Sequence, residues 1–166
     1  MNRSLYIVIP LALILTVLQA TMLARVSVFG VSLQPALLVA IAWSILRGPY
    51  EGLVWAFIIG VILDFFSIGP TGSMALALMI AVLPLTYLNH MLPENTYVMP
   101  IALTALGVVI YLLVYTVILA IAQMGFRSNV LIDLPLTVLL NTLLSIPIYW
   151  SLRWTSRLLY PRQIEL

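Results

Sequence analysis

Residues 60–72 read GVILDFFSIGPTG, and this stretch decides how we interpret the rest of the chain. It places an acid, Asp64, inside an apolar run with no basic residue close by, and it ends in a turn rich in glycine and proline. An ionised carboxylate costs roughly 2.5–3.5 kcal/mol at a bilayer centre, so Asp64 must face protein or water. Apolar sequence resumes at Ser73. The stretch therefore predicts a helical hairpin in a membrane, with a buried acid before a tight turn.

The composition of the whole chain predicts a membrane protein. Of its 166 residues, 64% are hydrophobic and 7% are charged, and the mean hydropathy is +1.19. Soluble domains average about 45–50% apolar and about 25% charged residues, so lipid must cover this surface. The absence of cysteine excludes thiolate chemistry, and a net charge of +2 is too small for a nucleic-acid surface. Residues 20–22 are a poor signal-peptide cleavage site, so we expect a retained first helix.

Apolar segments separated by proline, glycine or charged residues predict an all-α integral membrane protein with six transmembrane helices, in one domain covering residues 1–166. The expected spans are 5–23, 34–46, 50–66, 72–91, 98–124 and 134–152. The second and third are shorter than the ~20 residues a bilayer requires, so either the bilayer thins there or longer neighbours shield them. Gly125 fits the end of the fifth helix. Asp133 fits the cap of the sixth, with Pro135 in its first turn.

The arginines predict the orientation of the chain. Six spans place both termini on one side, together with the connection that holds Arg47. Five arginines then lie on that side (Arg3, Arg47, Arg153, Arg157 and Arg162) and two on the other (Arg25 and Arg127). The positive-inside rule makes both termini cytoplasmic, so the turn after Asp64 faces outward. Residues 25–33 are amphipathic and are expected to lie or turn at the outer interface. The C-terminal arginines fit ordinary topology signals, and contact with anionic lipid is the alternative.

Two kinds of role are open for Asp64. It lies near the C-terminal end of its helix, where the helix dipole disfavours an anion, so a partner is needed. One hypothesis is that it accepts hydrogen bonds from N–H groups or hydroxyls around Thr71 to Ser73 and locks the hairpin; Arg25 and Arg127 are rival partners. The other is a proton or ion site, which usually requires further acids or histidines inside the membrane. The sequence places no second acid in mid-helix.

Two amide side chains lie inside apolar segments. Asn141 is in the middle of the last span, where an interhelical hydrogen bond worth roughly 0.6–2 kcal/mol is expected and a substrate contact is the alternative. Gln19 lies near a face of small residues at every fourth position, Ala12, Thr16 and Ala20, where a second helix could approach closely. We expect Gln19 to form a hydrogen bond across that face.

Residues for catalysis or metal binding are scarce in the sequence. His90 and Glu94 are four residues apart, but Pro93 separates them, so both are expected in a loop and not at a metal site. No nucleophile with its base, no phosphate-binding loop and no zinc signature is recognisable. The sequence therefore predicts a protein that is not an enzyme and holds neither a cofactor nor a metal.

Several short motifs are similar to those of one family. They are the run 18–21 (LQAT), Pro35, the spacing of Gly60, Asp64, Ser67, Pro70 and Gly72 within residues 52–72, and Asn141 before Pro147 and Tyr149. Together they resemble the bacterial rod-shape-determining MreD family, over most of the chain. The most specific part is the pattern G-x-x-x-D-x-x-S-x-x-P-x-G. One departure is Ala36, at a position where that family often has Asp or Asn.

This resemblance implies a non-enzymatic membrane scaffold of the cell-elongation complex in the bacterial cytoplasmic membrane, supporting peptidoglycan synthesis and cell shape. The implied partners are MreC, RodA with its penicillin-binding protein, and indirectly MreB, with no nucleic acid. The candidate structural or interaction residues are Gln19, Gly60, Asp64, Ser67, Pro70, Thr71, Gly72 and Asn141. Members of the family also resemble the six-helix substrate-binding subunits of energy-coupling-factor vitamin transporters. A subunit of a small-molecule transporter is therefore the alternative function.

Overall fold

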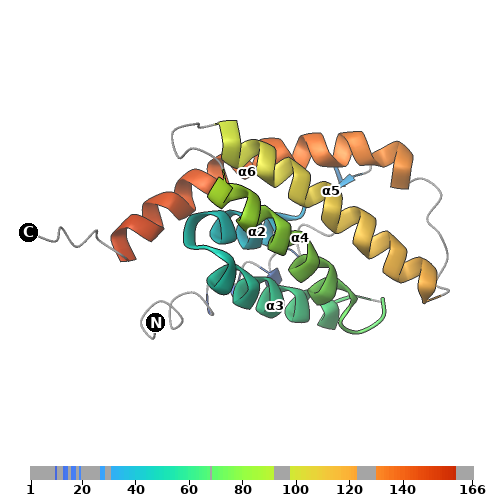
Figure 1. Cartoon of the computed structure of the whole chain (residues 1–166). Coiled ribbons are helices and arrows are strands. Elements are labelled where there is room, and N and C mark those ends of the chain that lie inside the picture. Colours follow the sequence, from blue (N-terminus) through green and yellow to red (C-terminus); the bar gives the residue numbers. More distant parts are fainter. Residues whose placement is uncertain are drawn as a thin grey trace, which may run out of the picture.

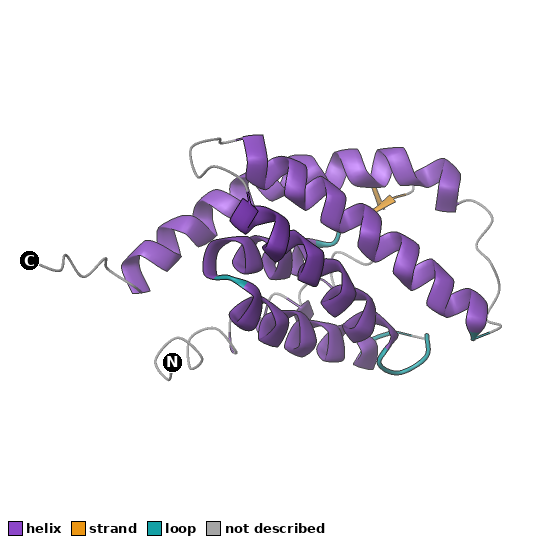
Figure 2. Ribbon diagram, in the orientation of Figure 1, coloured by secondary structure: helices purple, strands orange, loops and turns teal. Residues whose placement is uncertain are grey.

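In the part of the chain that it describes, the computed structural model consists of helices, their connections and one short two-stranded sheet (Figures 1 and 2). It describes residues 10, 13–14, 16–17, 19, 27–28, 31–67, 69–91, 98–122 and 130–159. The strands β1 (Ser27–Val28) and β2 (Val31–Ser32) form an antiparallel pair. The helices that follow are α2 (Pro35–Arg47), α3 (Pro49–Phe65), α4 (Ser73–Met91), α5 (Val98–Ile121) and α6 (Val130–Leu159). The described residues between 10 and 19 are also helical.

Helix α2 is the centre of the bundle. It packs against α3, α4, α5 and α6, and every residue from Pro35 to Ile45 is buried (Figure 1). A helix that is apolar on all sides requires such enclosure, and PALLVAIAWSILR has no polar face. Its 13 residues extend about 20 Å, less than the hydrocarbon thickness of about 30 Å. Longer neighbours therefore shield α2, which is one of the two alternatives that the sequence leaves open.

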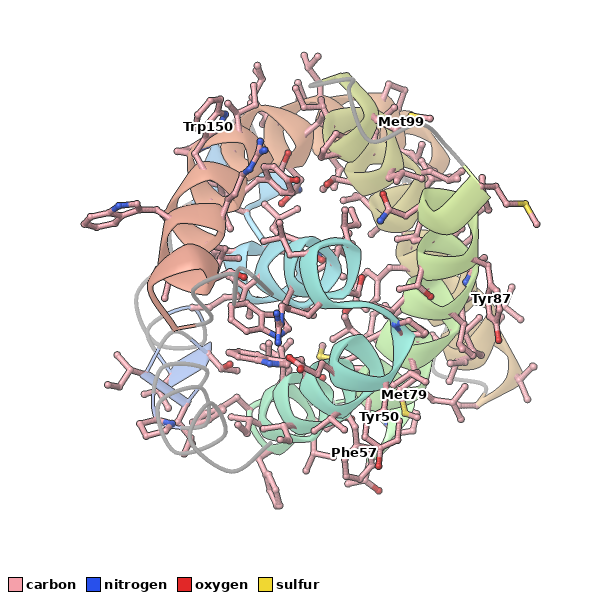
Figure 3. The ribbon with its side chains drawn as sticks, turned by 60° about the vertical axis from the view of Figure 1, so that its left-hand side comes forward. Tyr50, Phe57, Met79, Tyr87, Met99 and Trp150 are labelled. Carbon is pink, nitrogen blue, oxygen red and sulfur yellow. The ribbon has the colours of Figure 1, made fainter. Side chains whose placement is uncertain are left out.

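The interior of the bundle holds polar side chains beside its apolar core, and its outer surface exposes large apolar side chains. On α6 the buried polar side chains recur at every fourth residue: Thr137, Asn141 and Ser145. The other side of the same helix exposes Leu139, Leu143 and Ile146. Figure 3 shows Tyr50, Phe57, Tyr87 and Trp150 at the periphery. Water would not stabilise this arrangement, whereas lipid does, because helices in lipid associate through close packing and polar contacts.

Among the described residues, two helical stretches are long and apolar enough to cross a bilayer unaided. They are Met99–Ile121 and Leu134–Ser156, of 23 residues each, or about 35 Å. Helices α2 and α4 contain shorter apolar stretches, Pro35–Arg47 and Ser73–Asn89. The helical membrane class is thus observed, while the count of six crossings and the likeness to transporter subunits stay predictions.

The last helix is longer at both ends than the predicted span, although its apolar stretch also begins at Leu134. The sequence predicts a helix over 134–152, started by Asp133 with Pro135 in its first turn, but α6 runs from Val130 to Leu159 and contains Pro135 and Pro147. A membrane helix tolerates internal proline because neighbouring groups satisfy the freed carbonyls. At the other end, the hydroxyl of Thr155 donates to the carbonyl of Ser151 at 2.9 Å, within the helix. The helix thus accommodates this polar residue beyond the predicted end.

One connection takes a form that the sequence leaves open, and the prediction for another residue is wrong. Residues 25–33, expected to lie or turn at the outer interface, contain the strands β1 and β2, which pair Ser27 with Ser32 and Val28 with Val31. His90 lies in the last turn of α4 and not in a loop. The helix continues to Met91 because Pro93 disfavours helical geometry only from the residue before it onward. Glu94, Gly125 and most of the predicted span 5–23 lie outside the described residues.

Candidate functional site at the turn between α3 and α4

Asp64 is the penultimate residue of α3, and its side chain is buried in the bundle with 7% of the residue exposed. Its Oδ1 accepts a hydrogen bond from the backbone N–H of Met74 at 3.0 Å and another from the hydroxyl of Ser73 at 3.4 Å. Its Oδ2 accepts one from the backbone N–H of Ala75 at 3.1 Å. Both carboxylate oxygens therefore bind the first turn of α4, and the acid joins two helices across the turn.

The two helix ends explain how this acid is accommodated. The C-terminal end of α3 carries a partial negative charge that disfavours Asp64, but the N-terminal end of α4 presents N–H groups and a partial positive charge. Gly72 precedes α4, and its carbonyl accepts the first helical hydrogen bond, from Leu76 N–H at 2.9 Å. Because glycine has no side chain, Asp64 supplies the acceptor that Ser, Asp or Asn usually supplies at that position. Gly72 has a φ of 91°, which other residues rarely adopt.

The turn itself is held by short-range hydrogen bonds. The hydroxyl of Ser67 accepts from the N–H of Gly69 at 3.0 Å. The N–H of Ser67 donates to the carbonyl of Asp64 at 3.2 Å, and the N–H of Ser73 donates to the carbonyl of Pro70 at 3.1 Å. The sequence S-x-G-P thus uses its hydroxyl to close one half of the turn, and its proline carbonyl to lead into α4.

Gly60 sets the distance between α3 and α4. A Cβ built on it would lie 2.2 Å from the Cα of Ala75 and 2.7 Å from the backbone N of Ala75. The backbones of the two helices are therefore in direct contact, as small residues permit in membranes. Asp64 follows Gly60 by four residues on the same helical face. Both residues act on Ala75: the glycine admits its backbone and the carboxylate binds its N–H.

Helix α5 packs against the turn from the side. The hydroxyl oxygen of Tyr115 lies 3.3 Å from where a Cβ on Gly69 would be. The ring of Tyr115 stacks on that of Tyr111, with centroids 5.9 Å apart and planes 4° apart. On the outside of the turn, Phe65 and Phe66 are exposed. The turn thus has a buried polar side that is bound within the bundle and an aromatic side that is open.

The structure brings most of the sequence-predicted site residues together at this turn. They are Gly60, Asp64, Ser67, Pro70, Thr71 and Gly72, of which Thr71 and Gly72 are exposed. The hydrogen bonds of Asp64 reach Ser73, as the sequence predicts, and then extend two residues beyond it. The rival partners, Arg25 and Arg127, lie outside the described residues.

Gln19 and Asn141 act at a different place, the start of α2. Asn141 Oδ1 accepts from the backbone N–H of Gln34 at 2.9 Å, and its Nδ2 donates to the carbonyl of Thr137 in its own helix at 2.9 Å. Gln19 Oε1 accepts from the backbone N–H of Ala36 at 2.7 Å. Two side-chain amides from distant parts of the chain therefore cap the N-terminus of α2.

Sequence reasoning misses a second polar cluster, at the opposite end of α3. Glu51 accepts hydrogen bonds from Nε and Nη2 of Arg47 and from the indole N–H of Trp43, each at 3.3 Å. Nearby, Asn89 Nδ2 donates to the carbonyl of Ile45 at 3.0 Å, near the end of α2. Arg47 ends α2 and Glu51 lies in α3, so the spacing rule for pairs on one helix does not predict their contact. Nothing in the sequence indicates where Asn89 binds.

These observations define a class of protein. It is a helical integral membrane protein whose buried polar side chains join one helix to another and whose large apolar side chains face lipid.

Comparison with known proteins identifies the family. The chain belongs to the MreD family, because the family model described as rod shape-determining protein MreD matches residues 1–157. No match was found among curated proteins or among solved structures. Membership gives the protein a role in determining rod shape, in a family of structural membrane proteins not known for enzymatic activity.

Proposed function

We propose that this protein is a non-enzymatic scaffold of the cell-elongation complex in the cytoplasmic membrane, which binds MreC and thereby supports peptidoglycan synthesis. The observation that carries the proposal is the turn after α3. The side chains of Asp64 and Ser67 form hydrogen bonds within the protein, whereas Phe65 and Phe66 are exposed at its surface. Such a turn is rigid and exposes apolar surface to which a protein partner can bind. Family membership supports the role in rod shape.

The turn suits a docking role because it is rigid before a partner arrives. Asp64 and Ser67 fix its backbone, so little conformational entropy is lost when a partner contacts the neighbouring aromatic side chains. Buried aromatic anchors contribute much of the binding energy at protein interfaces. The spanning helix of MreC docks against this protein, with Phe65 and Phe66 forming the outer rim of the contact.

The directions of the helices support the predicted orientation. Successive helices from α2 to α6 run in opposite directions, so the α2–α3 connection lies at the same end of the bundle as the C-terminus of α6, on the left of Figure 1. That end carries Arg47 and Arg153, and the Asp64 turn lies at the other end. With the arginine-rich end in the cytoplasm, the turn faces outward. The same complex also contains RodA with its penicillin-binding protein, and it contacts MreB indirectly.

Co-purification of MreC tests the proposal. Replacing Phe65 and Phe66 together by alanine should reduce the recovery of MreC about tenfold or more, because each truncated aromatic anchor costs over about 1 kcal/mol. Phe57→Ala is the matched control: Phe57 and Phe66 are each 53% exposed, but Phe57 lies in the middle of α3. It should leave recovery unchanged. Full recovery with the double variant, at unchanged helicity and melting temperature, would contradict the docking role of the turn.

The alternative, a substrate-binding subunit of a small-molecule transporter, predicts a different result. A ligand that binds the folded protein raises its melting temperature in proportion to the logarithm of ligand concentration over Kd. The purified protein should therefore show no change in a thermal-shift screen against vitamins. A clear and saturable rise with one vitamin would favour the alternative.

A further inference from the structure

The lipid-facing side of α6 changes in character along the helix. Large apolar side chains are exposed at intervals of three or four residues, which is the spacing of one helical face: Leu139, Leu143, Ile146, Trp150 and Trp154. The opposite face, with Asn141, Ser145 and Leu152, is buried against the bundle. The exposed face is therefore aliphatic in the middle of α6 and aromatic toward its C-terminal end, where Trp150 is 57% and Trp154 69% exposed.

Two arginine positions lie on the same face as the tryptophans. Arg153 and Arg157 follow Trp150 by three and seven residues, so the positions 150, 153, 154 and 157 have the i, i+3, i+4, i+7 spacing of one helical stripe. Arg153 is partly exposed. Further along the sequence come Arg162 and one acid, Glu165. The last turns of α6 thus combine exposed indole rings with positive charge.

The length of α6 places these residues at the boundary of the bilayer. Its 30 residues extend about 45 Å, which exceeds the hydrocarbon thickness of about 30 Å, and the C-terminal part projects beyond the other helices (Figure 1). Along the exposed face, aliphatic side chains come first, and tryptophan and arginine positions then alternate at 150, 153, 154 and 157. Tryptophan is typical of the membrane interface, and the long side chain of an arginine on the same turns reaches past the interface toward the phosphate layer.

We propose that the last turns of α6 bind the head groups of anionic phospholipids, with Trp150 and Trp154 in the interface and Arg153 at the phosphates, and with position 157 adding a second positive charge on the same face. A topology signal requires only positive charge on one side of the membrane, and does not require tryptophans and arginines on one face. An acidic protein partner would complement the arginines but would leave the exposed indole rings without their apolar layer. The proposal rests on α6 crossing the membrane and is independent of MreC.

Quenching of tryptophan fluorescence by brominated lipids tests this directly. The full chain is reconstituted in vesicles that mix phosphatidylglycerol and phosphatidylcholine, with bromine on one or the other lipid. Trp43 and Trp55 are buried, so contact quenching reports mainly on Trp150 and Trp154. The variants Trp150→Phe and Trp154→Phe show how much of the quenching comes from each of these two residues. A basic residue near an anionic membrane is worth about 1 kcal/mol, or about a fivefold preference. In the parent protein, quenching by brominated phosphatidylglycerol should therefore indicate at least a fivefold preference over phosphatidylcholine.

Charge variants separate lipid binding from general charge effects. Replacing Arg153 and Arg157 together by glutamine should bring the preference close to one, whereas replacing both by lysine should retain it. The preference of the parent should also fall as salt is raised. Circular dichroism verifies that the glutamine variant keeps the helicity of the parent. Equal quenching by the two lipids in the parent, or an unchanged preference in the glutamine variant, would overturn the proposal.

Discussion

Helix α3 is bound at each end by an acid, and the two acids are bound in different ways. Asp64 is 7% exposed and binds backbone N–H groups of α4, which the helix itself holds in place. The side chain of Glu51 is 30% exposed and binds the side chain of Arg47, which is 24% exposed. At the Asp64 end, both partners are fixed and away from solvent. At the Glu51 end, the ion pair is formed by two long side chains near the surface.

This difference predicts where the stability of the bundle is concentrated. A buried N–H group that loses its partner costs about 1–3 kcal/mol, and in lipid no water replaces the partner. A partly exposed ion pair contributes about 0–1 kcal/mol, because water solvates each partner when the pair separates. We therefore expect the Asp64 turn to hold α3 and α4 together and the Arg47–Glu51 pair to contribute little.

Asp64→Ala should have the largest effect. It removes the acceptor from Met74 N–H, Ala75 N–H and the Ser73 hydroxyl, and we expect a loss of about 3–4 kcal/mol in the free energy of unfolding. Asp64→Asn keeps one acceptor oxygen of similar shape and should lose about half as much. Denaturant titration in detergent micelles, followed by circular dichroism, measures both. Equal losses for the two variants would mean that the hydrogen bonds do not decide stability at this turn.

Gly60→Ala should have the next largest effect, about 2–3 kcal/mol, because its methyl group would meet the backbone of Ala75. Gly52→Ala is the matched change at the other end of α3, where a Cβ would lie 2.3 Å from the Cβ of Ser44. Only Gly60→Ala also displaces the N–H that Asp64 binds. The loss of unfolding free energy in the double variant Gly60→Ala/Asp64→Ala should therefore be smaller than the sum of the two single losses. For Gly52→Ala combined with Asp64→Ala, the losses should add. The same titrations measure this, and equal coupling for the two glycines would contradict it.

The Asp64 turn could be predicted from the sequence because its parts are adjacent in the chain. An acid in an apolar run, followed within a few residues by Ser67, Pro70 and Gly72, leaves few geometries open. The acceptor and the donors are separated by about ten residues, so the turn alone brings them together. What the structure adds is which N–H groups Asp64 binds, those of Met74 and Ala75.

The start of α2 could not be predicted, because its partners are far apart in the sequence. Asn141 and Gln34 are 107 residues apart, and Gln19 and Ala36 are 17 apart. The sequence indicates that each amide needs a partner, but the partner is set by how α2 packs against its neighbours. Similarly, the apolar sequence of α2 indicates burial, and only the packing shows it to be the central helix.

Glu51→Gln should have the smallest effect, at most about 1 kcal/mol, because it replaces a partly exposed ion pair. Glutamine keeps an oxygen that can still accept from the indole N–H of Trp43, which is buried. Unfolding measured with and without added salt checks this: salt should weaken the parent pair and reduce the difference between the parent and the variant.

A loss with Glu51→Gln as large as that with Asp64→Asn would remove the contrast between the two ends of α3. Arg47→Gln then identifies the cause, because it removes the same ion pair but leaves the hydrogen bond from Trp43 to Glu51 in place. A small effect of Arg47→Gln beside a large effect of Glu51→Gln would assign the stability to the buried indole N–H. In that case both ends of α3 would follow one rule, that a buried donor requires a charged acceptor.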